Sequence, residues 1–272
     1  MRVIGRFAPT PSGALHFGSL IAAVGSFVSA KRQGGSWLLR IEDIDRVRVV
    51  RGATAAILTQ LEAYGLFWDG AVVYQSERLE AYRQALELLQ KQGLTYSCRC
   101  SRKALAGRPH TAQCTAAIDR TAPAATRIRT TDETISFCDR LCGEVAQCVG
   151  REVGDFVLWR GAEPSYQLAV VVDDAAFGIS EVVRGADLLD STPRQIYLQR
   201  LLALATPAYT HLPLVLGSDG AKLSKQNLAQ PIGIENRAET MRKALEFLGF
   251  APPPPLAAAA PVEQLAWAIA QG

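Results

Sequence analysis

The sequence predicts an α/β protein built on a doubly wound parallel sheet. A short apolar run, Val3–Phe7, is typical of a strand, and a turn and a helix follow it. Ser36–Ile41 predicts a second strand, which ends at a cluster of carboxylates. Tyr166–Asp174 is almost continuously apolar until its two terminal aspartates, so we expect a central strand buried on both faces. Strands that alternate with helices in this way favour a parallel sheet.

The turn after the first strand carries the first candidate site. Pro9 and Pro11 fix φ, and Gly13 tolerates backbone conformations that other residues avoid. A strand, a glycine-bearing turn and a helix together present free backbone N–H groups to an anion. His16, beside Gly18 at the start of the helix, can donate to a phosphate oxygen. A turn histidine with only a local partner is the alternative interpretation.

The remaining strands and helices are predicted from the spacing of apolar residues and the charged residues that follow them. Glu42, Asp43 and Asp45 come directly after the second strand, where an α/β sheet places its ligand groups, although a solvated turn explains them equally well. Glu181–Leu188 predicts a short strand and a turn carrying Arg184. Helical spacing predicts helices at Ala53–Tyr64, Leu79–Leu89, Thr192–Leu204 and Met241–Phe247, and a short Ala-rich helix that ends at Gly272.

The six cysteines all lie between residues 98 and 148. Because no export signal precedes them, metal ligation is favoured over a disulfide framework. Three thiolates and an imidazole would form a tetrahedral zinc site, with Cys98, Cys100, His110 and Cys114 as ligands. The alternative is a group of reduced thiols beside a surface histidine. We expect Cys138, Cys142 and Cys148 to be free cysteines around the strands at Phe137 and Val145.

Composition restricts the class of protein. The 272 residues are 49% hydrophobic, which suits a folded protein, and their net charge of +3 neither demands nor excludes a polyanionic partner. The basic residues are not gathered in one tail, so we expect no basic arm for nucleic acid. Arg2 and the apolar segment after it imitate a secretory signal, but Pro9, Pro11 and His16 argue against one. No apolar run approaches the length of a bilayer, so we expect a cytoplasmic protein.

A second candidate site lies in the last third of the chain. Lys222 and Lys225 flank Leu-Ser in a loop preceded by Gly220, and such a loop can neutralise phosphate charge in a transition state. Taken alone, the segment is more typical of an ordinary solvated lysine loop.

Read together, the two sites resemble the signatures of class I aminoacyl-tRNA synthetases. Leu15-His16-Phe17-Gly18 is similar to the HIGH motif, and Lys222-Leu-Ser-Lys225-Gln226 is similar to the KMSKS motif. Arg6–Gly13, Leu39–Asp45 and Arg184–Leu188 resemble the glutamyl branch, and the resemblance covers roughly residues 3 to 230. Fewer than fifty residues follow Asn227, too few for an anticodon-binding domain, so the chain resembles the shorter glutamyl-Q tRNA(Asp) synthetase family.

This resemblance implies a class I, Rossmann-like catalytic domain with a zinc-bearing insertion and a short helical C-terminal region. We expect the two halves of the catalytic domain at residues 1–95 and 161–205, the insertion at 96–160, and the KMSKS-like loop with the C-terminal helices at 206–272. The implied reaction is activation of L-glutamate by ATP with Mg²⁺, without tRNA. Glutamate then passes to the queuosine base at the anticodon wobble position of tRNA(Asp). The alternative is a minimal glutamyl-tRNA synthetase that charges a tRNA 3′ end. A monomer is expected.

The resemblance also implies roles for individual residues. The implied glutamate contacts are Arg6, Phe7, Ala8, Pro9, Thr10, Glu42, Tyr166 and Arg184. His16, Gly18 and Lys225 would contact ATP, and His16, Lys222 and Lys225 would act in catalysis. The zinc ligands would be Cys98, Cys100, His110 and Cys114. The chain departs from the family pattern at Phe17, at Gln226 and at His110, where the family pattern leads us to expect tyrosine as the third ligand.

Overall fold

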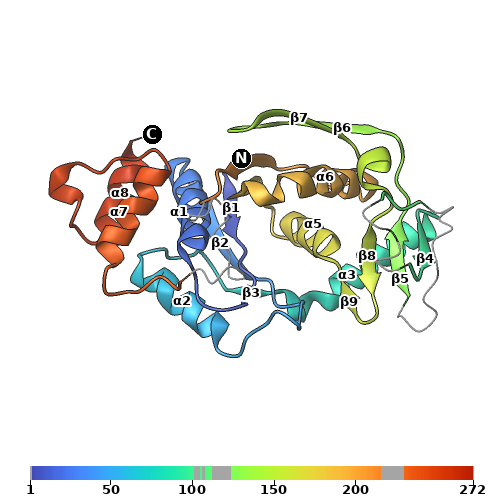
Figure 1. Cartoon of the computed structure of the whole chain (residues 1–272), viewed down its shortest axis with the longest axis horizontal. Coiled ribbons are helices and arrows are strands. Elements are labelled where there is room, and N and C mark those ends of the chain that lie inside the picture. The colour runs from blue at the N-terminus through green and yellow to red at the C-terminus, as the bar shows by residue number, and fades with distance from the viewer. Residues whose placement is uncertain (1, 101–104, 106–107, 112–123, 216–229, 272) are drawn as a thin grey trace. The chain divides into compact units, whose positions relative to one another are not determined.

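The computed structural model describes residues 2–100, 105, 108–111, 124–215 and 230–271 (Figure 1). The chain divides into two compact units. The first comprises Met1–Ser76, Ile179–Leu188 and Pro207–Gly272, and the second comprises Glu77–Gly178 and Leu189–Thr206. Among the described helices, none combines the length and apolar character that crossing a membrane requires.

The first unit is built on parallel strands. β1 pairs with β2 from Ile4 opposite Ser36, β2 pairs with β3, and β10 pairs with β11, all in parallel. Ser180, just before β10, exchanges hydrogen bonds with Ile4 at the start of β1, and β10 lies alongside β1. The elements are β1 (Ile4–Phe7), α1 (Phe17–Arg32), β2 (Ser36–Ile41), α2 (Ala53–Ala63), β3 (Val73–Tyr74), β10 (Glu181–Gly185), β11 (Ala208–Leu212), α7 (Arg237–Phe247) and α8 (Pro261–Ala270).

The core of the first unit lies where α1 packs on β1 and β2 (Figure 1). Trp37 is fully buried there, and its indole N–H donates to the Ser26 hydroxyl at 2.9 Å, so the polar atom of this large side chain is satisfied. Asp69 joins α1 to β2, because one of its carboxylate oxygens accepts from Lys31 Nζ and from the Trp37 backbone N–H, each at 2.7 Å. The core therefore fixes the strand whose end carries Glu42.

The second unit is mixed, and its described strands pair antiparallel. β4 pairs with β5, β5 with β8, β8 with β9, and β6 with β7. Helices α3, α5 and α6 complete the unit, and α5 packs against both of the others. The elements are α3 (Leu79–Lys91), β4 (Thr95–Cys98), β5 (Ala125–Ile128), β6 (Thr134–Asp139), β7 (Gly143–Cys148), β8 (Val157–Arg160), β9 (Glu163–Pro164), α5 (Tyr166–Ala176) and α6 (Thr192–Leu201).

The predicted central strand at Tyr166–Asp174 is wrong, because this segment forms helix α5. The Ser165 hydroxyl accepts from the Leu168 backbone N–H and caps the helix, and Gly178, at φ +63°, follows its end. Short apolar runs do not distinguish a buried strand from a buried helix. Asp173, expected at a strand end, is instead buried inside the helix, where it accepts from Arg78 at 2.6 Å and from Tyr82 at 2.8 Å.

Candidate functional site

The turn between β1 and α1 has the predicted strand–turn–helix geometry. Gly13 adopts φ +136°, a region that favours glycine. His16 is the N-cap of α1, and its Nδ1 accepts from the Ser19 backbone N–H at 3.3 Å. The local partner foreseen for a turn histidine is therefore present. Because Nδ1 is the acceptor, the proton of the neutral ring lies on Nε2, the atom that could donate to a phosphate at the helix N-terminus.

Three predicted glutamate contacts belong to one edge of the parallel sheet. Arg6 lies near the end of β1, Glu42 directly follows β2, and Arg184 lies near the end of β10. Their exposed fractions are 4%, 8% and 5%. Carboxyl ends of parallel strands form the usual ligand edge of such sheets. Tyr166 belongs to the second unit, at the first turn of α5, and its predicted contact with glutamate stays a prediction.

Glu42 is held by contacts that the sequence analysis missed. Arg40 donates to its carboxylate at 3.2 Å, and the Glu42 backbone N–H donates to the Pro9 carbonyl at 3.0 Å. The second bond attaches the Ala8–Thr10 loop to the end of β2. Only the Arg40 contact had a signal in the sequence, because Glu42 follows Arg40 by two residues at the end of a strand, and residues two apart along a strand point to the same face.

Arg184 is held by β11 and by Leu188, which follows β10. Its Nε donates to His211 Nε2 at 3.1 Å, and its Nη2 donates to the Leu188 carbonyl at 3.4 Å. The guanidinium also lies over the Tyr209 ring, 5.6 Å from the centroid. His211 is directly opposite Arg184 in the parallel pairing. Sequence reasoning missed both aromatic residues, since strand register is not visible in one sequence.

The chain after the lysine motif returns to the HIGH-like turn. Pro231 pairs with His16, and the Ile232 backbone N–H donates to the Leu15 carbonyl at 2.9 Å. Buried Gln60 joins both segments, because it accepts from the Leu15 N–H at 2.7 Å and donates to the Ile232 carbonyl at 2.8 Å. Lys222, Lys225 and Gln226 lie outside the described residues. Pro231, the second described residue after this gap, is nevertheless paired with His16.

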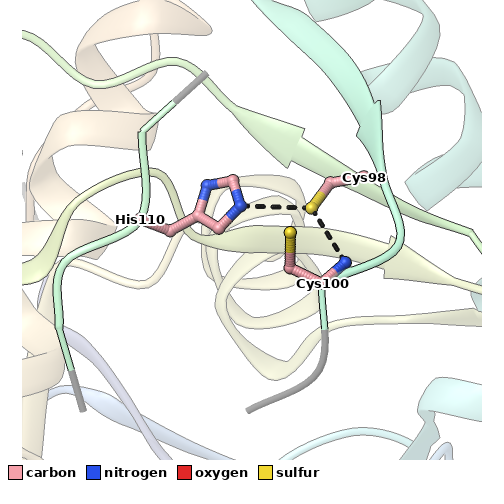
Figure 2. Close-up of side chains that lie close together, drawn as sticks. All are labelled: Cys98, Cys100 and His110. Atoms are coloured by element: carbon pink, nitrogen blue, oxygen red, sulfur yellow. Dashed lines mark hydrogen bonds between the residues drawn. The ribbon is translucent and has the colours of Figure 1, made fainter. Parts of the chain in front are cut away.

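The predicted metal ligands Cys98, Cys100 and His110 meet in the second unit (Figure 2). All are buried, and their ligand atoms lie within 4.8 Å of one another. Cys98 Sγ lies 3.2 Å from His110 Nε2, close to the separation of about 3.5 Å that tetrahedral zinc–sulfur and zinc–nitrogen bonds would give. The fourth predicted ligand, Cys114, lies outside the described residues. The donor atoms of Cys98, Cys100 and His110 therefore have the type and spacing that a zinc ion requires.

The electrostatics of this cluster suit metal binding. Burial raises the pKa of the Cys98 thiol, but hydrogen bonds from Cys100 and the charge of Arg127 outweigh it, so the pKa is lowered overall. Burial lowers the pKa of His110, and Arg127 lowers it further, which favours the neutral imidazole that a metal requires. Cys138, Cys142 and Cys148 form no disulfide bond, as predicted, and Cys142 lies in the turn between β6 and β7.

Several known proteins are similar to this chain in sequence. The sequence model of the catalytic domain of class I tRNA synthetases (E and Q) matches residues 2–135 and 110–249. The chain is 52% identical to a glutamyl-Q tRNA(Asp) synthetase of Pseudomonas aeruginosa strain LESB58, over 98% of this chain and 92% of that protein. It is 50% identical to a protein of the same name from Thiobacillus denitrificans, over 97% of this chain and 91% of the relative.

A solved structure gives the same fold. The structure of a glutamate tRNA ligase from Elizabethkingia meningosepticum, in complex with its amino acid, superposes with a TM-score of 0.73 at 26% identity. The match covers 83% of this chain and 52% of the ligase, so the chain spans about half of that longer protein.

Proposed function

Because the chain belongs to the family of class I tRNA synthetases for glutamate and glutamine, we propose that it activates L-glutamate with ATP and transfers glutamate to queuosine in tRNA(Asp). The similarity to glutamyl-Q tRNA(Asp) synthetases carries this proposal, since it is 52% identity over 98% of the chain. The buried guanidinium groups of Arg6 and Arg184 at the sheet edge support a substrate with two carboxylates. The proposal includes a monomer in the cytoplasm, where ATP and tRNA are available.

In the first step a glutamate carboxylate oxygen attacks the α-phosphorus of ATP. A bond forms between this oxygen and phosphorus, and the bond to the bridging oxygen breaks and releases pyrophosphate. The reaction needs no covalent enzyme intermediate, so the protein contributes positioning and electrostatic stabilisation. Mg²⁺ enters with ATP as part of the substrate. A hydroxyl of the tRNA then attacks the glutamyl carbonyl carbon. An ester bond forms, the anhydride bond between that carbon and the phosphate oxygen breaks, the hydroxyl proton is lost, and AMP leaves.

The charged residues among the predicted contacts, and His16, have roles in this scheme. Arg6 and Arg184 would bind the substrate carboxylates, because a guanidinium binds a carboxylate through two parallel hydrogen bonds. Glu42 would bind the α-ammonium group, with Arg40 fixing its side chain. His16 and the start of α1 would bind the triphosphate, close to Gly18. Lys225, with Lys222, would neutralise charge on the five-coordinate α-phosphorus.

We also propose a structural zinc ion held by Cys98, Cys100, His110 and Cys114. When bound, zinc would join β4 to the loop that carries His110 and so stabilise the second unit. The ion would take no part in glutamate activation.

The decisive test is transfer of labelled glutamate to tRNA(Asp) with and without queuosine at the wobble position. Label that requires queuosine and resists removal of the tRNA 3′ end would support the proposal. Label that appears only on the 3′ end of tRNA(Glu) would identify a minimal glutamyl-tRNA synthetase and overturn the proposed acceptor. Pyrophosphate exchange without tRNA tests the activation step separately.

A further inference from the structure

Behind His110, on the side away from the cysteines, lies a tyrosine–carboxylate pair. Tyr96 on β4 places its hydroxyl 2.8 Å from His110 Nδ1 and 2.7 Å from Asp155 Oδ2. Both hydrogen bonds are partly buried, and Asp155 itself is 6% exposed. We propose that Tyr96 and Asp155 set the tautomer of His110, so that its Nε2 carries the lone pair that binds the metal. The inference rests on the proposed metal site and is independent of the tRNA substrate.

The direction of the hydrogen bonds follows from the groups involved. Asp155 Oδ1 accepts from the Thr130 backbone N–H at 2.7 Å and from its hydroxyl at 2.9 Å, and a carboxylate has no proton to donate. The single proton of Tyr96 therefore goes to Asp155 Oδ2. The tyrosine oxygen is left as the acceptor for His110, so the histidine proton lies on Nδ1 and faces Tyr96.

The surroundings hold this arrangement in place. The Asp155 backbone N–H donates to the His110 carbonyl at 2.6 Å. This bond holds the backbone of Asp155 beside the backbone of His110. The Arg129 guanidinium covers the Tyr96 ring at 4.8 Å.

On the side of His110 that faces the cysteines, the tautomer leaves a lone pair on Nε2. With the proton on Nδ1, Nε2 offers its lone pair toward Cys98 Sγ, at 3.2 Å (Figure 2). The opposite tautomer would place a proton where the metal must bind. Partners of this kind orient a ligand and raise its basicity, and their loss costs about 10–100-fold in metal affinity. Tyr96 is thus a positioning residue for His110.

The tautomer is directly measurable by nitrogen-15 NMR of the imidazole rings. The chain has only three histidines, so comparison with His110→Gln assigns the His110 signals. In reduced, metal-free protein we expect the proton on Nδ1 of His110. Tyr96→Phe keeps the ring and removes the hydroxyl, and it should abolish this preference. A proton on Nε2 in the unsubstituted protein would overturn the proposal.

Zinc affinity provides a second measurement, by competition with a chelator under reducing conditions. Tyr96→Phe should bind zinc about 10–100-fold more weakly. Tyr82→Phe is the matched control, since it removes the same kind of tyrosine–carboxylate hydrogen bond, here to Asp173 of α5, and should leave zinc affinity unchanged. Equal affinities for the two variants, or no zinc retained by the unsubstituted protein, would overturn the inference. Neither the NMR measurement nor the zinc measurement involves glutamate or tRNA. Failure of the tautomer inference is therefore distinguishable from failure of the proposed reaction.

Discussion

Replacement of Arg184 by lysine tests how the sheet edge recognises glutamate. The Arg184 side chain is buried and held by His211 and the Leu188 carbonyl. Lysine keeps the positive charge but loses the planar fork that binds a carboxylate through two bonds. If Arg184 binds the substrate, its replacement should weaken binding of glutamate and leave binding of ATP intact.

The magnitude follows from burial and the type of bond. Arg184 is 5% exposed, so water has little access to replace a lost contact. A hydrogen bond to a charged group contributes about 1.5–3 kcal/mol, and about 1.4 kcal/mol is a factor of ten in affinity. We therefore expect the KM for glutamate to rise by about 10- to 150-fold.

Pyrophosphate exchange without tRNA is the assay, with glutamate and ATP varied in turn. Arg242→Lys is the matched control, because Arg242 lies on α7 in an ion pair with Glu246 and should leave both KM values unchanged. An unchanged KM for glutamate in Arg184→Lys would refute the assigned role. An equal rise in the KM for ATP would also refute it, since the arginine would then support the site in general.

Three further predictions concern catalysis, the metal cluster and stability. Lys225→Ala should slow adenylate formation by more than about tenfold, and an unchanged exchange rate would contradict its role. Gly154 has φ +74°, and a Cβ at this position would collide with the His110 backbone. Gly154→Ala should therefore lower the stability measured by thermal unfolding by about 1–3 kcal/mol and reduce the amount of bound zinc. Full zinc retention would argue against this packing. Partial burial raises the pKa of Asp69, but bonds from Lys31 and Trp37 outweigh it and lower the pKa below 3.8. Asp69 therefore stabilises the fold above that pH and loses its effect as pH falls; Asp69→Asn should cost under about 1 kcal/mol at pH 7, with a difference from the unsubstituted protein that shrinks in acid.

Local signals account for what could be predicted. The strand, turn and helix around His16 follow from an apolar run, prolines and a glycine that adopts φ +136°, all of which act through neighbouring atoms. The helices at α2, α3 and α6 follow from apolar spacing. The segment of α5 was predicted as a strand, because its apolar run hides the period of the helix. The Ser165 cap and Gly178 were the signals that could have corrected it.

The sequence by itself determined the signature motifs, the strands β1, β2 and β10 and the candidate ligands Cys98, Cys100 and His110, because residue type and short spacing carry that information. Only the tertiary structure decided which partners hold these groups. Tyr96, His110 and Asp155 meet although 14 and 59 residues separate Tyr96 from its two partners, and Arg184 meets His211 through strand register. Such contacts depend on how distant segments pack. Packing fixes the proton on a histidine and the direction of a guanidinium, and no local pattern encodes either.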